Sequence, residues 1–451
     1  MIYRVLRAYF RFALKIFYRS IEIEGLADVP AAGPVIFAPN HANGLLDPMF
    51  IALAVERPVW LTAKSTLADH PLVGWLMRAS NVVALHRTQD AVMGADPRAN
   101  LAALATLGMR LRDGGAIIIF PEGQSHSDPG LRPFKRGVAR LAYDYVAAGN
   151  VGGLSIVPVG MWFEDKDGFR SRALIRFGPS VDVGAWRAAQ PDAPAQALTA
   201  ELQAAVDAAA ITFTDRREAL MLAYAAELAE TRGRHPAPLG AAGPRLGARA
   251  DLVERLRRGY RLLSAAAPAE LDPLIDRVAD YRRRLRRMGI TPGEVYLPLD
   301  APLAARFVVR EAAVVLVGLP FALWGIVTHA VPALIVAIAA RQLAKRNDER
   351  ATSAVFSALV AFPPWYVAAT VWFFVRWPWM LALAATVATP VCGVAALLWL
   401  GRVRAAYRRA ATYVRFVRAP ELQRSLADEG QGVLETLRGY EARLGEGGGG
   451  A

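Results

Sequence analysis

A histidine and an aspartate stand close together in the stretch N-H-A-N-G-L-L-D-P at residues 40–48. His41 and Asp47 are residue types that can form a general base and the carboxylate that orients it. At about 100° per residue, six steps leave two side chains well apart around a helix, so a turn must bring them together if they meet. A buried histidine satisfied by a carboxylate would give the same pattern. The pair alone therefore leaves a catalytic and a structural interpretation open.

Three further stretches place polar residues or a proline in or directly after apolar runs. Arg87 follows N-V-V-A-L-H, the stretch F-P-E-G-Q-S-H occupies 120–126 after G-A-I-I-I, and I-V-P-V-G occupies 156–160. Open α/β sheets build their sites at the carboxyl ends of strands. A guanidinium there could face an anion, and a Pro-Glu-Gly turn could hold a polyol hydroxyl. Taken singly, each stretch also has a purely structural interpretation. Arg87 could form a surface ion pair, F-P-E-G could be a simple turn, and I-V-P-V-G could be a strand that contains a proline.

The elements that must position these residues follow from the hydrophobic pattern. Between 34 and 178, short apolar runs alternate with longer helical stretches such as 97–112, which indicates an α/β domain with a largely buried sheet, assigned to 23–182. Residues 183–305 are rich in Ala, Arg and Leu, with a Gly- and Pro-rich break at 232–245. We expect a helical subdomain there.

The first 22 residues predict an amphipathic helix. Its basic residues recur at steps of three and four: Arg4, Arg7, Arg11, Lys15 and Arg19. Apolar residues occupy most of the other face, and the interspersed charges leave no apolar core for a cleavable signal peptide. We expect this helix to lie in a membrane interface with its apolar side down. The alternative is a helix packed on its own domain.

A membrane region is predicted over 306–418. The runs 354–375 and 377–400 are each about long enough to cross a ~30 Å hydrocarbon layer, and Trp-Pro-Trp after Arg376 predicts a hairpin. The run 312–340 contains two prolines and favours a re-entrant or interfacial helical pair. Both ends of this hairpin are rich in arginine, which predicts that they lie on the cytoplasmic side of the membrane. We expect the active site on the same side. The alternative is a soluble helical bundle. Residues 419–451 predict a helix and a disordered Gly-rich tail.

Composition supports membrane contact. Hydrophobic residues make up 54% of the chain, and the mean hydropathy is +0.25. The net charge of 53 − 40 = +13 is spread along the chain, which favours an anionic lipid surface and phosphate-bearing substrates over nucleic acid. Cys392 is the only cysteine, which excludes an internal disulfide and a cysteine-based zinc site. The oligomeric state stays open.

Taken in order, the four stretches resemble the blocks of the glycerolipid acyltransferase superfamily, which makes phosphatidic acid and its precursors. His41 with Asp47, Arg87, Phe120 to Gly123 and Val157 to Val159 match those blocks, and Lys64 matches a lysine common between the first two. The usual His-Asp spacing has four intervening residues, whereas this chain has five; Gly44 could absorb the extra residue in a tight turn. The run E-G-Q-S-H and the residues after it resemble fungal-type glycerol-3-phosphate and dihydroxyacetone-phosphate acyltransferases and their bacterial relatives.

The resemblance implies a mixed sheet flanked by helices, followed by a helical subdomain and C-terminal transmembrane helices. It implies transfer of a fatty acyl group from an acyl thioester to the sn-1 hydroxyl of glycerol 3-phosphate or dihydroxyacetone phosphate, with lysophosphatidate as the alternative acceptor. His41 and Asp47 would be catalytic, with acyl-CoA or acyl-carrier protein as co-substrate and neither metal nor cofactor. The implied substrate-binding residues are Arg87, Lys64, Phe120, Pro121, Glu122, Gly123, Ser125, His126, Lys135 and Pro158.

Two other functions compete with this interpretation. A serine hydrolase would use Ser125 as its nucleophile, but G-Q-S-H-S lacks the Gly-x-Ser-x-Gly elbow. An inactive membrane-bound lipid-binding protein is suggested by the extra residue between His41 and Asp47.

Overall fold

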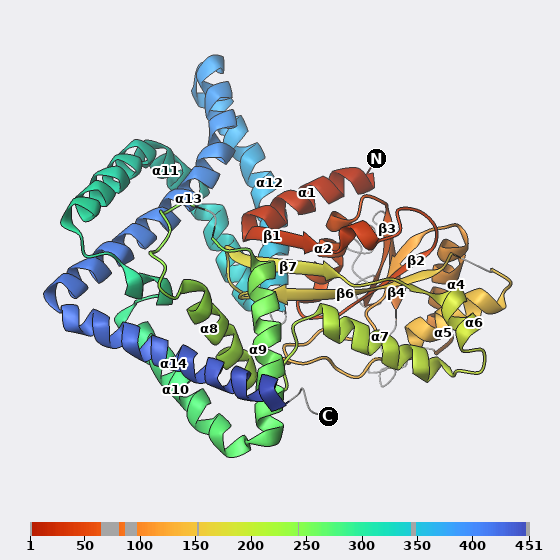
Figure 1. Ribbon diagram of the computed structural model, residues 1–451. Coiled ribbons are helices and arrows are strands. Elements are labelled where there is room, and N and C mark those ends of the chain that lie inside the picture. Colours follow the sequence, from red (N-terminus) through yellow and green to blue (C-terminus); the bar gives the residue numbers. More distant parts are fainter. Residues whose placement is uncertain are drawn as a thin grey trace. The chain divides into compact units, whose positions relative to one another are not determined.

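The computed structural model describes residues 2–64, 81–85, 97–150, 153–241, 243–343 and 349–447 (Figure 1). The chain divides into two compact units. The first comprises Met1–Thr212 with Ala337–Leu359, and the second comprises Phe213–Val336 with Val360–Ala451.

The first unit is built on a mixed sheet, as expected. Within the described residues its order is β1-β7-β6-β2-β5-β3-β4, with β8 paired to β6. Strand β6 is antiparallel to β7 and β8, and the other pairs are parallel. The strands are β1 (Tyr18–Glu24), β2 (Val35–Pro39), β3 (Val59–Lys64), β4 (Val82–Leu85), β5 (Ala116–Ile118), β6 (Ser155–Phe163), β7 (Ser171–Phe177) and β8 (Val181–Asp182).

Apolar residues cover both faces of this sheet. In β2, Val35 and Phe37 enter one core cluster while Ile36 and Ala38 enter the other, because successive side chains of a strand point to opposite faces. Helices α1 (Ile2–Phe17) and α2 (Asp47–Ala54) cover the first face. The second face is covered by α4 (Pro97–Arg112), α5 (Gly137–Ala147), α6 (Val183–Ala189) and α7 (Ala195–Ala209). Such two-sided burial explains the near-continuous apolar strands.

The unit boundaries differ from those expected. Helices α6 and α7 belong to the α/β unit, whose first segment ends at Thr212 and not at 182, because Trp186, Leu198 and Leu202 pack into the sheet core. An Ala-rich composition shows that a segment is helical but not which core it joins.

The N-terminal helix ends at Phe17, not near residue 22, because the next residues form β1 against β7. Leu14 is fully buried, and the Arg7 guanidinium donates to the carbonyl oxygens of Leu53 and Val55 at the end of α2. The helix therefore packs on its own domain, which was the alternative interpretation. Its outward side still exposes Val5 and Phe12.

The second unit contains a helical core. Its helices α8 (Arg216–Thr231) and α9 (Leu246–Ala266) flank the predicted Gly- and Pro-rich break. Helices α10 (Pro268–Met288) and α14 (Pro420–Gly447) complete it, and the Tyr281 hydroxyl of α10 donates to the Leu426 carbonyl of α14 at 2.9 Å. Helix α14 continues three residues beyond Leu444, further than the expected start of the Gly-rich tail, and residues 448–451 lie outside the described chain.

Within the part of the chain that the structure describes, three helices are long and apolar enough to cross a membrane: α11 (Ala301–Leu343), α12 (Arg350–Arg376) and α13 (Trp379–Arg418). The expected re-entrant or interfacial pair at 312–340 is wrong, because α11 runs through it as one helix. Pro332 has no N–H to pair with the carbonyl of Thr328, but the indole N–H of Trp365 donates to that oxygen at 2.7 Å. A neighbouring helix thus replaces the missing hydrogen bond, which allows the helix to continue.

Candidate active site

The site begins where the parallel strands β2 and β5 end side by side. Asn40 follows β2 directly, and its amide donates to the Met161 carbonyl at 3.1 Å while accepting from the Met161 N–H at 2.7 Å. These bonds tie the end of β2 to β6. His41 therefore leaves the sheet from a fixed backbone.

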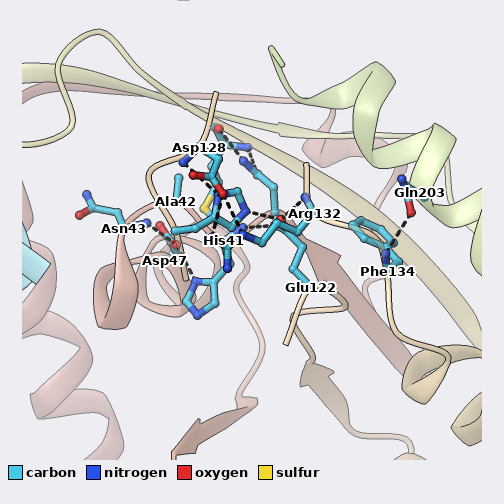
Figure 2. A network of polar contacts seen from close by, with 12 residues as sticks. His41, Ala42, Asn43, Asp47, Glu122, Asp128, Arg132, Phe134 and Gln203 are labelled. Carbon is cyan, nitrogen blue, oxygen red and sulfur yellow. Dashed lines mark hydrogen bonds and ion pairs between the residues drawn. The ribbon is translucent and has the colours of Figure 1, made fainter. Parts of the chain in front are cut away.

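A tight turn brings His41 and Asp47 together (Figure 2). Gly44 has a φ of +56°, which is strained for residues with a side chain, and Gly44–Leu46 form one turn of 3₁₀ helix before α2 begins at Asp47. His41 Nδ1 lies 2.8 Å from Asp47 Oδ2. The fifth intervening residue is thus accommodated in this turn without separating the pair.

The contacts of Asp47 define the tautomer of His41. Asp47 is fully buried; burial raises the pKa of its carboxyl, and hydrogen bonds from His41 and the Asn43 N–H oppose that rise. Oδ2 accepts the Asn43 N–H at 2.7 Å. When the carboxyl is ionised it can only accept, and His41 Nδ1 then carries the hydrogen of the 2.8 Å contact. In the described chain no hydrogen bond engages Nε2, and this nitrogen keeps its lone pair. The ring stacks on Phe120, with centroids 3.8 Å apart.

Glu122, which follows β5, supports the His41 loop. One carboxylate oxygen accepts the His41 N–H at 2.8 Å, and the other accepts the Arg132 N–H at 2.8 Å and a hydrogen bond from His126 Nε2. Because His126 Nδ1 accepts the Asp128 N–H, its Nε2 must carry the hydrogen. These contacts favour a bracing role for Glu122 and His126 over the expected direct contact with the glycerol.

Gly123 and Lys135 form a second part of this turn. Gly123 has a φ of +75°, and a Cβ there would lie 2.8 Å from Lys135 Nζ. The Lys135 N–H donates to the Pro121 carbonyl at 2.8 Å, which holds the lysine over the turn. Lys135 is exposed, whereas Pro121 and Ser125 are buried. The positive φ favours glycine at this position, and the lysine side chain lies in the space that a Cβ would occupy.

Three further residues were expected in the site: Pro158, Lys64 and Arg87. Pro158 is buried inside β6, in register with Ala38, and its ring lies against Gly178, so it supports the sheet. Lys64 is the last residue of β3, at the same edge of the sheet as the end of β5. Arg87 lies outside the described residues.

Three residues that the sequence did not single out support the loop between His41 and Asp47. The Asn43 amide donates to the Tyr18 hydroxyl at 2.8 Å, and that hydroxyl donates to the Lys166 carbonyl at 3.1 Å. Lys166 Nζ in turn donates to the Ala42 carbonyl at 3.2 Å, and its charge favours the ionised form of Asp47. Asn43 lies within the stretch at residues 40–48, so its closeness to the pair in the sequence was a signal for a supporting role. Tyr18 and Lys166 come from distant segments, and nothing in their local sequence pointed to this site.

The family of this domain follows from comparison with known proteins. Residues 20–162 match the family model described as Acyltransferase. They contain the sheet edge, the His41–Asp47 pair and the Glu122 turn. Residues 20–162 are therefore an acyltransferase domain of the glycerolipid acyltransferase superfamily.

Proteins similar to this chain include some that are named for different acyl acceptors. It is similar to an uncharacterized acyltransferase of Schizosaccharomyces pombe, 24% identical over 62% of this chain and 53% of that protein. Glycerol-3-phosphate O-acyltransferase 2 of Saccharomyces cerevisiae is 38% identical over 19% of this chain and 12% of its own length. The chloroplastic 1-acyl-sn-glycerol-3-phosphate acyltransferase BAT2 of Brassica napus is 29% identical over 28% of this chain and 34% of its own. The chain thus spans about half the length of the Schizosaccharomyces pombe protein and a smaller share of the other two.

Proposed function

We propose that this protein transfers a fatty acyl group from an acyl thioester to the sn-1 hydroxyl of glycerol 3-phosphate or dihydroxyacetone phosphate. The observation that carries the proposal is the 2.8 Å contact between His41 Nδ1 and Asp47 Oδ2, with Nε2 left available as a base. The turn of residues 120–126 beside this pair supports it further.

In the proposed reaction, His41 Nε2 removes the proton from the acceptor hydroxyl as its oxygen bonds to the thioester carbonyl carbon. The resulting tetrahedral intermediate collapses by breaking the C–S bond, and the imidazolium returns its proton to the leaving thiolate. Asp47 fixes the tautomer and stabilises the imidazolium, as the carboxylate does in serine hydrolase triads. A general base of this kind contributes about 10²–10⁴ in rate.

Cationic residues would bind the acceptor phosphate. Arg87 is the first candidate on the family pattern, because a guanidinium can engage phosphate through two hydrogen bonds. Lys64 is the second, at the end of β3. Lys135 is a third, since its exposed ammonium group lies beside the Gly123 turn.

The two competing functions have less support. The extra residue that suggested an inactive protein is accommodated by Gly44. For a serine hydrolase, Ser125 would need a histidine base, but both ring nitrogens of nearby His126 are engaged by Glu122 and Asp128.

The acceptor is the test of this proposal. Gln124, Ser125 and His126 follow Glu122-Gly123 where lysophosphatidate enzymes more often carry Thr-Arg, which favours a small polar acceptor. We expect kcat/KM for glycerol 3-phosphate, or its ketone analogue, to exceed that for lysophosphatidate at least tenfold, a difference of ~1.4 kcal/mol in transition-state binding. A side-by-side assay with the purified protein measures the ratio. A higher value for lysophosphatidate would support the second candidate, consistent with the name of the Brassica napus relative.

The three apolar helices indicate a membrane protein, and the arginines flanking α12 and α13 support an active site on the cytoplasmic side. Single cysteines at Arg376, Arg404 and the exposed Asp192, in a Cys392→Ser background, can test this. An impermeant maleimide should label positions 404 and 192 from the cytoplasmic side and 376 only from the opposite side. Labelling of position 376 from the cytoplasmic side would contradict a spanning hairpin.

A further inference from the structure

The first turns of α12 belong to the same unit as the His41–Asp47 pair. Although α12 is apolar enough to cross a membrane, residues 350–359 pack on the α/β core. Ala351 and Val355 are almost completely buried, in the cluster that contains Leu46 and Phe50 on either side of the start of α2. Helix α1 contacts these turns as well, because the Tyr9 hydroxyl donates to the Leu359 carbonyl at 2.8 Å. The base of this helix is therefore held against the catalytic loop.

Thr352 makes a polar contact from this position. Its hydroxyl donates to the Asn43 carbonyl at 3.0 Å, in a buried hydrogen bond that joins residues 309 positions apart. Asn43 is held at three other points: its N–H donates to Asp47 Oδ2, its amide donates to the Tyr18 hydroxyl, and its carbonyl oxygen also accepts the Leu46 N–H at 3.2 Å. The asparagine thus connects α12 to the carboxylate that orients His41.

The place of this contact in the turn gives it a mechanical role. The Asn43 carbonyl belongs to the peptide that leads into Gly44, whose φ of +56° opens the turn to Asp47. A peptide beside glycine meets few steric barriers to rotation. A shift of this peptide would displace the turn that joins Asn43 to Asp47, and the Thr352 hydroxyl opposes it together with the Leu46 N–H.

We propose that Thr352 is a positioning residue for the reaction: through Asn43 it holds Asp47 and His41 in their catalytic arrangement. The proposal rests on the function proposed above. It makes the base of a membrane-crossing helix a part of the active-site support.

The chain offers a matched control on the same helix. Ser357 is also buried and lies five residues after Thr352, but in the described chain its hydroxyl has no hydrogen-bond partner. Thr352→Val removes the donor and keeps the shape of the side chain. Thr352→Ser keeps the donor, and Ser357→Ala removes a hydroxyl from the same helix without breaking this contact.

The experiment measures transfer kinetics and the histidine tautomer for these variants in detergent. We expect Thr352→Val to lower kcat about tenfold, with KM for both substrates within twofold of the wild-type value. Thr352→Ser and Ser357→Ala should stay near the wild-type kcat. Histidine-selective ¹⁵N NMR, assigned with His41→Gln, should show less of the Nδ1–H tautomer of His41 in Thr352→Val only. If this variant does not fold, Thr352→Ala replaces it.

Three results would overturn the proposal: an unchanged kcat with unchanged His41 signals in Thr352→Val, equal losses in Thr352→Val and Ser357→Ala, or no rescue by serine. The NMR measurement requires no turnover. If the wild-type protein acylates neither glycerol 3-phosphate nor lysophosphatidate, the proposed function fails, and the His41 signals still decide whether Thr352 positions the pair.

Discussion

Replacement of His41 by alanine is expected to lower kcat by at least about 10²-fold, because it removes the group that takes the proton from the acceptor hydroxyl. The fold should survive this change. The backbone N–H and carbonyl of residue 41 bond to Glu122 and to the His126 N–H, and an alanine keeps both contacts. Acyl-transfer kinetics give the effect on kcat, and acceptor binding to the variant should remain measurable by calorimetry.

His235→Ala is the matched control, because His235 is exposed and lies in the second unit. It should keep the wild-type rate. If His41→Ala retained more than about a tenth of the wild-type kcat, the assignment of His41 as the base would be wrong, since loss of a general base costs more than that.

Asp47→Asn is expected to lower kcat by about 10²-fold at neutral pH. The amide oxygen can still accept the two hydrogen bonds that Oδ2 accepts now, from His41 and the Asn43 N–H. The substitution therefore removes mainly the negative charge that stabilises the imidazolium. Asp128→Asn serves as a control, because Asp128 pairs with Arg132 at the surface and such exposed pairs contribute little. Equal rates for Asp47→Asn and the wild type would exclude an electrostatic role for Asp47.

The same variant should be at least as stable as the wild type at neutral pH. Burial raises the pKa of Asp47 in the folded state, so ionisation of this carboxyl disfavours folding as pH rises from the ordinary pKa of an aspartate through the raised one. Asparagine carries no such cost. Thermal unfolding should therefore show a gain in Tm for Asp47→Asn at pH 7 that shrinks as the pH falls towards about 4, the ordinary pKa of an aspartate. A Tm difference that grew on acidification would contradict the sign of this shift.

The local part of the site was predictable from the sequence. The carboxyl ends of strands carry His41 and the turn at Glu122, and Gly44 was identified as the residue that could absorb the extra position. These features depend on residues close together in the chain, where turn chemistry and strand periodicity act directly.

The supporting contacts were not predictable in the same way. Tyr18, Lys166 and Thr352 reach the His41 loop from elements that the sheet topology and helix packing bring together, and their local patterns describe a strand start, a loop and an apolar helix. The path of α11 through Pro332 was missed for a similar reason, since the hydrogen bond that replaces the missing one comes from Trp365 on another helix. Hydrophobic patterns predict elements but not their partners.

The central claim is that this chain moves an acyl group from a thioester to a phosphorylated glycerol, and product analysis tests it most directly. Purified, detergent-solubilised protein is incubated with a labelled acyl-CoA and glycerol 3-phosphate, and free thiol and acylated product are measured together. We predict one acyl-glycerol phosphate for each thiol released, with no thiol release when the acceptor is omitted. If acyl-carrier protein is the true donor, the same one-to-one ratio should appear with its thioester. Thiol release without acylated product, or no turnover with either thioester and any phosphorylated glycerol acceptor, would contradict the account.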